Sequence, residues 1–368
     1  MRVLYWTEQF WPHIGGVEVL SSNFIPAMRD RGHEFAVATS HSGLDLPDED
    51  EWEGVPLRRF PFRQAIGDGD MGSIARATRG VAALKREFRP ELVHVRMADP
   101  SVFFHLRTRD AHSCPLLVSV TNAPPEAGAG PGTLLDSVMS SAAWVTANSE
   151  AILEDVLRLA PRVRGRASVV HPAQVVPGVE PAPRQLDPPT ILCLGRVVDE
   201  KGFDVAMVAF ARVRRELPAA RLVIAGDGPN RSTLEAQARD LGLEEAVSFR
   251  GWVPPERVPD LINEAAIVAI PSRWREAFCL VAVEGALMER PVVATNVGGL
   301  AEAVADGETG LLVPGDDPAA FADALLSLLR DPNRAAAMGR AGRARAIREF
   351  DHDAHVDAYA DIYARLAA

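Results

Sequence analysis

The chain contains very little lysine. Of its 39 basic residues, only Lys85 and Lys201 are lysines, so arginine supplies positive charge almost everywhere. Lysine carries a compact point charge on a flexible stem, whereas the arginine guanidinium is a planar fork. The rare lysine at position 201 therefore suggests a site that requires a mobile point charge.

Cysteine and long apolar runs are also scarce. Cys114, Cys193 and Cys279 are an odd set without metal-ligand spacing, so we expect reduced thiols. No segment approaches the roughly 18 apolar residues of a membrane span, and the amino terminus lacks a signal-peptide layout. We therefore expect a cytoplasmic protein.

A net charge of −11 argues against a nucleic-acid binder, although a local basic patch could make peripheral contact with a membrane.

The length and the order of the apolar segments predict two α/β domains. A chain of 368 residues with 47% apolar residues can bury two cores. Short apolar runs alternate with helical periodicity in both halves, which is typical of parallel, doubly wound sheets. We predict domains at residues 1–172 and 190–350, joined by a proline-rich linker at 173–189. The amphipathic helix at 351–368 is expected to cross back and brace the first domain.

Two features of the first half favour structural roles. Residues 41–72, rich in Asp, Gly and Pro, are expected to form a long irregular connection. Asp48, Glu49 and Asp50 could be proposed as metal ligands, but no further ligands stand at motif spacing, which favours a solvated loop. His94, within Leu-Val-His-Val, is more typical of a core histidine with satisfied hydrogen bonds than of a functional one.

The second half carries the chemistry. A strand-like run ends at Gly195 and is followed by Arg196, Lys201 and a helix. Free N–H groups at the start of that helix, together with the two cations, form an anion site. Glu276 and Glu284 supply acceptors for hydroxyl groups, Glu276 from the loop before a helix and Glu284 from its second turn. Groups that can bind phosphate therefore lie near carboxylates that can accept hydrogen bonds from hydroxyl groups. This combination predicts a nucleotide-sugar pocket.

The motifs of the second half resemble those of the retaining glycosyltransferases of family 4 in order and spacing. In the first half, Gly15-Gly16-Val17-Glu18 adds a weaker match. The resemblance implies a GT-B fold, in which two Rossmann-like domains face each other across a cleft. The motifs are Gly195-Arg196 with Lys201-Gly202, Ala225-Gly226-Asp227-Gly228-Pro229, Phe249-x-Gly251-Trp252-Val253, Pro271-Ser272, Glu276 with Glu284, Pro291-Val292-Val293-Ala294-Thr295 and Gly298-Gly299.

The resemblance also implies residue roles. Arg196 and Lys201 would grip the donor diphosphate, and Glu276 would contact the transferred sugar, which makes these three the catalytic candidates. Glu284 would bind the ribose hydroxyls. The other donor-binding candidates are Gly16, Arg250, Val253, Cys279 and Leu280.

The acceptor would be held mainly by the first domain, with His13 and Asn122 as its candidate contacts. Two positions depart from the family pattern. Glycine is usual where this chain has Cys279, and many relatives have a histidine near Thr121 and Asn122. A cysteine with negative φ would still offer its N–H to phosphate, and Asn122 could hydrogen-bond a sugar hydroxyl.

We therefore predict a retaining, metal-independent glycosyltransferase without a cofactor. Its donor would be a nucleoside diphosphate sugar, a UDP-sugar before a GDP-sugar, and its acceptor would be a small molecule, a glycan or a lipid-linked molecule. The two departures leave open a catalytically impaired nucleotide-sugar-binding protein of the same fold. A nicotinamide oxidoreductase is disfavoured because no Gly-x-Gly-x-x-Gly follows the first strand.

Overall fold

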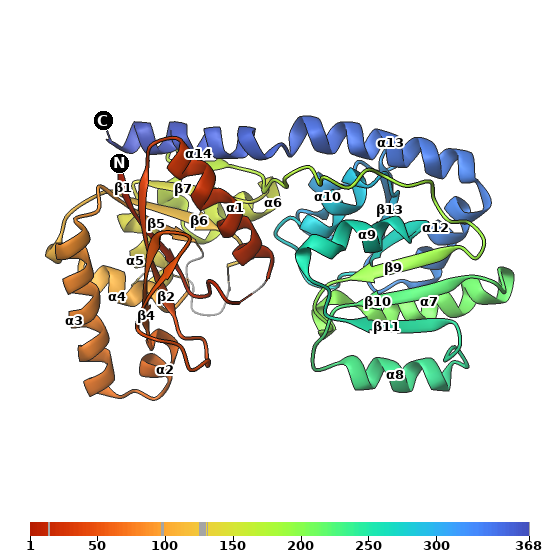
Figure 1. Cartoon of the computed structure of the whole chain (residues 1–368), viewed down its shortest axis with the longest axis horizontal. Helices are drawn as coiled ribbons and strands as arrows, with labels where there is room; N and C mark the ends of the chain where they lie inside the picture. Colours follow the sequence, from red (N-terminus) through yellow and green to blue (C-terminus); the bar gives the residue numbers. More distant parts are fainter. Residues whose placement is uncertain (14, 97–98, 125–129, 131, 368) are drawn as a thin grey trace. The chain divides into compact units, whose positions relative to one another are not determined.

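The chain folds into two compact units, each built around one sheet (Figure 1). The computed structural model describes residues 1–13, 15–96, 99–124, 130 and 132–367. One unit consists of Met1–Pro172 together with Asp353–Ala368, and the other consists of Ala173–His352. The proline-rich stretch at 173–189 thus belongs to the second unit.

The sheet of the first unit has the strand order β3-β4-β2-β1-β5-β6-β7-β8. Its neighbouring strands are parallel, except that β3 is antiparallel to β4. The strands are β1 (Arg2–Thr7), β2 (Glu34–Ser40), β3 (Glu49–Trp52), β4 (Val55–Phe60), β5 (Leu92–Arg96), β6 (Leu116–Val120), β7 (Trp144–Ala147) and β8 (Ala167–Val169). The helices are α1 (Gly16–Asp30), α2 (Phe62–Gly67), α3 (Met71–Phe88), α4 (Val102–Arg107), α5 (Leu134–Ser141), α6 (Glu150–Leu159) and α14 (His352–Ala367), with 3₁₀ turns η1 (Arg109–Ala111) and η2 (Pro161–Val163).

The expectation of an irregular connection over residues 41–72 is wrong. Strands β3 and β4 form a hairpin that turns at Glu53 and Gly54, where φ is 49° and 77°, and α2 follows it. Strand β3 is a short acidic edge strand, and β4 contains Pro56 and two arginines, so neither gives an apolar run that stands out in the sequence. Asp50 has a structural partner here, since it lies 2.8 Å from the buried guanidinium of Arg59.

Helix α14 packs on the sheet of the first unit (Figure 1). Tyr359 and Tyr363 share its core with β1 and β2. The Tyr363 hydroxyl lies 2.7 Å from His94 Nδ1, and the Tyr359 hydroxyl lies 3.0 Å from Ser119 Oγ. Burial, helped by the nearby Arg96 charge, holds the pKa of His94 well below its usual range. The return of the last helix and the structural role of His94 are both confirmed.

The sheet of the second unit has the order β11-β10-β9-β12-β13-β14, and its neighbouring strands are parallel. The strands are β9 (Thr190–Leu194), β10 (Arg221–Ala225), β11 (Val247–Gly251), β12 (Ile267–Ile270), β13 (Val292–Thr295) and β14 (Gly310–Val313). The helices are α7 (Phe203–Glu216), α8 (Arg231–Asp240), α9 (Val258–Asn263), α10 (Leu280–Leu287), α11 (Leu300–Ala303), α12 (Pro318–Arg330) and α13 (Pro332–Glu349), with 3₁₀ turns η3 (Asp199–Lys201) and η4 (Pro255–Arg257).

Strand β9 lies at the centre of this second sheet. Ile191 and Cys193 enter the core on one face, and Leu192 enters the core on the other. Burial on both faces explains why this strand reads as a continuous apolar run. The strand order reverses between β9 and β12. Open α/β sheets bind ligands beyond the carboxyl ends of their strands at such a reversal.

Candidate functional site

The carboxyl end of β9 leads directly into the predicted anion motif. Gly195 and the exposed Arg196 follow the strand, and Lys201 is the last residue of η3. Gly202 then caps α7 with a left-handed φ of 63°. A Cβ at this position would lie 2.1 Å from the carbonyl oxygen of Pro271. Both the backbone angle and the close approach require glycine.

Lys201 contacts Glu276 from the loop that precedes α10. Its Nζ donates to Glu276 Oε1 at 2.6 Å, and Ser272 Oγ donates to the same oxygen at 2.6 Å. Burial opposes the charge of Lys201, but Cys279 in its ionised form and the Glu276 carboxylate outweigh it, so the pKa of Lys201 is raised. The ammonium group is therefore charged at neutral pH, and the structure brings together two of the three catalytic candidates.

The Gly298-Gly299 motif packs against the backbone of the loop that carries Glu276. A Cβ at Gly298, where φ is 56°, would lie 2.2 Å from the Glu276 carbonyl oxygen, and one at Gly299 would lie 2.4 Å from that of Ala277. The Gly299 N–H donates to the Glu276 carbonyl at 2.7 Å. This contact gives the glycine pair a physical purpose, because any side chain would displace the loop that carries Glu276.

Arg273 joins the two segments of the motif, and the sequence analysis missed it. Its guanidinium donates to the Asp199 carboxylate at 3.2 Å and to Asp204 Oδ1 at 2.7 Å. Its Nε donates to Asp316 at 2.5 Å, and its backbone N–H donates to the Glu200 carbonyl at 2.9 Å. Arg273 thereby fixes η3, which carries Lys201, to the loop that carries Glu276. One arginine among the 37 of this chain gives no sequence signal for this role.

Cys279 adopts a backbone conformation that the sequence analysis did not expect. The condition under which its N–H would serve phosphate was a negative φ, and the structure does not meet it, because φ is 85° and ψ is 89°. This left-handed conformation favours glycine and is costly for a β-carbon-bearing residue. Burial, with a contribution from Glu276, raises the pKa of the Cys279 thiol to about 12, so the thiol is neutral. Leu280, the other donor candidate of this segment, is the first residue of α10.

Glu284 lies in the second turn of α10, as expected, while Glu276 lies in the preceding loop. Its neighbours Ala282 and Val283 are each 1% exposed. Burial raises the pKa of Glu284 to about 7. The Gln174 side chain donates to Glu284 Oε1 at 3.0 Å. Burying a carboxylate in this apolar setting costs free energy unless hydrogen-bond donors compensate for it. Glu284 is therefore a candidate for binding a ligand that supplies such donors.

The two candidates for reading the base occupy the end of β11. Arg250 is exposed on the strand, and its guanidinium lies 3.2 Å from Glu264 Oε2. Val253 follows in the segment before η4 and is partly buried. Their role in base recognition stays a prediction.

The remaining candidates belong to the first unit. Gly16 begins α1, and His13 precedes it in the loop after β1. The His13 N–H donates to the Phe10 carbonyl at 3.0 Å, and its Nε2 is buried without a partner in the structure. Asn122 lies two residues beyond β6, at the carboxyl edge of that sheet. Their acceptor and phosphate roles stay predictions.

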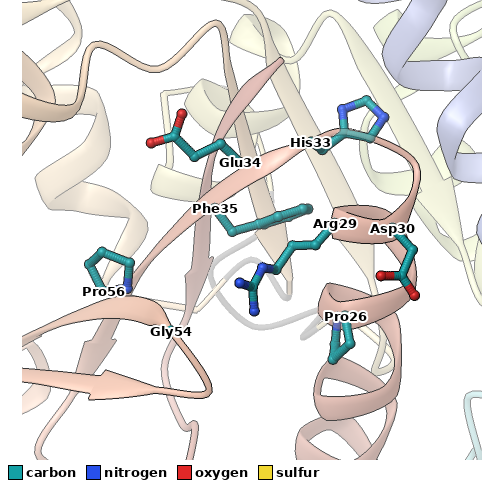
Figure 2. A pocket seen from close by; sticks show the side chains of 8 residues that line it. All are labelled: Pro26, Arg29, Asp30, His33, Glu34, Phe35, Gly54 and Pro56. Atoms are coloured by element: carbon teal, nitrogen blue, oxygen red, sulfur yellow. The ribbon is translucent and has the colours of Figure 1, made fainter.

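A pocket of about 560 Å³ lies elsewhere in the first unit (Figure 2). Arg29, at the end of α1, lines it and donates to the Glu53 carbonyl at 2.6 Å. Glu34 and Phe35 place the pocket at the amino end of β2, the edge opposite to the one at which such sheets bind ligands. None of the predicted site residues lines this pocket.

Two general properties of the described part of the chain bear on the site. Within it, no three His, Cys, Asp or Glu side chains are grouped so as to hold a metal ion. No helix formed by the placed residues has both the length and the apolar character needed to cross a bilayer.

Two family models match the chain in succession. The model for glycosyl transferases group 1 matches residues 180–345, and the glycosyl transferase 4-like domain matches residues 15–173. D-inositol 3-phosphate glycosyltransferase 2 from Catenulispora acidiphila is 35% identical over 386 residues, which cover 95% of this chain and 90% of that protein. The chain belongs to glycosyltransferase family 4. The family predicted from the motifs is therefore confirmed.

Other relatives of this chain match over different lengths. A GDP-mannose-dependent phosphatidylinositol monomannoside mannosyltransferase from Mycolicibacterium smegmatis is 42% identical over 163 residues. That match spans 43% of each chain, less than half of the relative's length. Sucrose-phosphate synthase from Thermosynechococcus elongatus superposes with a TM-score of 0.85 at 22% identity, covering 99% of this chain and 98% of that one. Anabaena HepE, crystallised with UDP and glucose, gives 0.82 at 21%, covering 99% and 100%. These structures share the GT-B fold that the motifs predicted.

Proposed function

We propose that this glycosyltransferase moves a sugar from a nucleoside diphosphate sugar to an acceptor hydroxyl, with retention of anomeric configuration. The observation that supports it best is the 2.6 Å contact between Lys201 Nζ and Glu276 Oε1 beyond the carboxyl end of β9. Arg196 is the second residue after the same strand. In this proposal the two cations would bind phosphate, and the neighbouring Glu276 carboxylate would accept from sugar hydroxyls.

The two cations act on charge that develops during the reaction. As the bond between the anomeric carbon and the phosphate oxygen breaks, negative charge grows on the β-phosphate. Lys201 and Arg196 would stabilise this leaving group more strongly than the bound donor, which is the condition for catalysis. The acceptor oxygen would attack the same face, and a β-phosphate oxygen would take its proton. Because the cations supply the neutralisation that a divalent ion provides elsewhere, we propose a metal-independent reaction.

The donor and acceptor classes follow from the site and from the relatives. A GDP-sugar serves the Mycolicibacterium relative by its name, and UDP lies in the Anabaena structure. Both are compatible with Glu284, which would read ribose and not the base. The order expected from the sequence, UDP before GDP, is our proposal for the donor. The acceptor would be a hydroxyl-bearing small molecule, a glycan or a lipid-linked molecule that contacts His13 and Asn122. A lipid-linked acceptor would be reached through peripheral membrane contact.

Proton NMR of the purified protein with UDP-glucose or GDP-mannose and a panel of polyol acceptors tests the proposal. The α-linked donor should be consumed and an α-linked product should appear, because retention keeps the anomeric configuration. Addition of a chelator should leave the rate unchanged. A β-linked product would contradict retention, and loss of the rate on chelation would contradict the metal-independent reaction.

A second candidate is a protein that binds the nucleotide sugar without transferring it. The left-handed backbone of Cys279, where relatives usually have glycine, favours it. Under this reading, the sugar nucleotide would bind with saturation while the NMR signals of donor and acceptors stay unchanged over hours. Conversion of the donor at a rate proportional to protein concentration would exclude it.

A further inference from the structure

Gln174 is held firmly at the start of the second unit. Its side chain and backbone are buried, with 8% of the residue exposed. Its N–H donates to the Phe350 carbonyl at 3.3 Å, and the residue forms a parallel β-bridge with Asp351. These two backbone contacts hold Gln174 beside Phe350 and Asp351, close to the end of the second unit at His352.

The side chain of Gln174 reaches the carboxylate of Glu284, which is 110 residues away in sequence. Its Nε2 donates to Glu284 Oε1 at 3.0 Å. The carboxylate has two oxygens with about four lone-pair sites, and one of these receives the amide. The other sites remain for incoming donors. The partner is neutral, so it orients the carboxylate without neutralising it as lysine or arginine would.

We propose that Gln174 is a positioning residue for ribose recognition: its amide orients Glu284 so that the two carboxylate oxygens accept from the 2′- and 3′-hydroxyls of the donor nucleotide. This inference rests on the proposed function, in which Glu284 binds ribose. A freely rotating glutamate would lose side-chain entropy on binding, whereas a preoriented one has already lost it. A bidentate acceptor also discriminates, because a 2′-deoxynucleotide leaves one buried oxygen without a partner.

The variant Gln174→Met tests this role, since methionine has nearly the same size and offers no N–H. Isothermal titration would measure binding of UDP and 2′-deoxy-UDP, or of GDP and 2′-deoxy-GDP if guanine is the preferred base. We expect Kd for the ribonucleotide to rise about tenfold, the effect of one hydrogen bond to a charged group. Kd for the deoxynucleotide should change less than about twofold. The preference for ribose should therefore fall towards one.

Two further variants make the result specific. Gln174→Asn keeps an amide but is one methylene too short, so it should behave like Gln174→Met and serves if the methionine variant does not fold. In Glu284→Gln, adding Gln174→Met should cause no further loss of ribose preference, because the two residues act as a unit.

Equal weakening of both nucleotides in Gln174→Met would show a structural role only and would overturn the inference. An unchanged ribose preference would overturn it as well. In either case, a wild type that binds and discriminates would leave the proposed function intact. A wild type that binds no nucleotide would overturn the proposed function and, with it, this inference.

Discussion

The variant Lys201→Ala is expected to lower kcat about a hundredfold to a thousandfold, the usual effect of removing one group that stabilises developing charge. Lys201 is the cation that the structure places against Glu276, at 2.6 Å. Its removal takes away positive charge where the β-phosphate leaves, and it leaves Glu276 held by Ser272. Initial rates with saturating donor measure the effect. KM for the donor should change much less than kcat.

Two controls accompany this measurement. Lys201→Arg keeps the charge but replaces the point charge by a planar fork, so it should retain diphosphate binding while losing part of kcat. Arg239→Ala removes an exposed cation on α8 in the same unit and should leave the rate unchanged. Turnover of Lys201→Ala at the wild-type rate, in a protein with an unaltered circular dichroism spectrum, would refute the assignment of the phosphate grip.

The variant Glu284→Gln is expected to weaken donor binding about 10- to 100-fold, because hydrogen bonds to a charged acceptor are each worth about 1.5–3 kcal/mol. Burial raises the pKa of Glu284 to about 7. Only the ionised form accepts from both hydroxyls, so wild-type affinity should fall as pH drops through about 7. Titration calorimetry across this range should show no such dependence in the variant.

The same group gives a stability signature without ligand. The pKa of Glu284 in the folded protein is above its ordinary value of 4.5, so the folded state binds more protons than the unfolded state between these values. Stability therefore falls as pH rises from about 4.5 to about 7. Glu284→Gln should lack this decline and should be the more stable protein at pH 7.5. A less stable variant with unchanged donor affinity would show that Glu284 is structural.

Much of the fold could be predicted from local pattern. Parallel strands buried on both faces produce the apolar runs of β9 and β12, and Gly195 marks the turn that follows β9. The hairpin of β3 and β4 was missed because β3 is a short acidic edge strand and β4 contains Pro56 and two arginines. A local pattern cannot reveal pairing that only the neighbouring strand stabilises.

Some residues of the candidate site could likewise be predicted from the sequence, and others could not. Arg196, Lys201, Glu276 and Glu284 could be found because their residue types and spacing carry chemistry. Arg273 and Gln174 could not, because their partners lie 69 and 110 residues away and are brought near only by the fold. The left-handed backbone at Cys279 was also missed, since a residue other than glycine gives no sign of a positive φ.

Thermal-shift measurement with UDP, GDP, ADP and TDP tests the central claim most directly, because donor binding precedes every later step. Ligand at about 100 times Kd stabilises the folded state by about 2.7 kcal/mol, which should raise Tm by roughly 5–10 °C. We predict this shift for one nucleoside diphosphate, UDP before GDP, with a much smaller shift for its monophosphate. Equal melting temperatures with all four diphosphates and without ligand would contradict a nucleotide-sugar site formed by Arg196, Lys201 and Glu284.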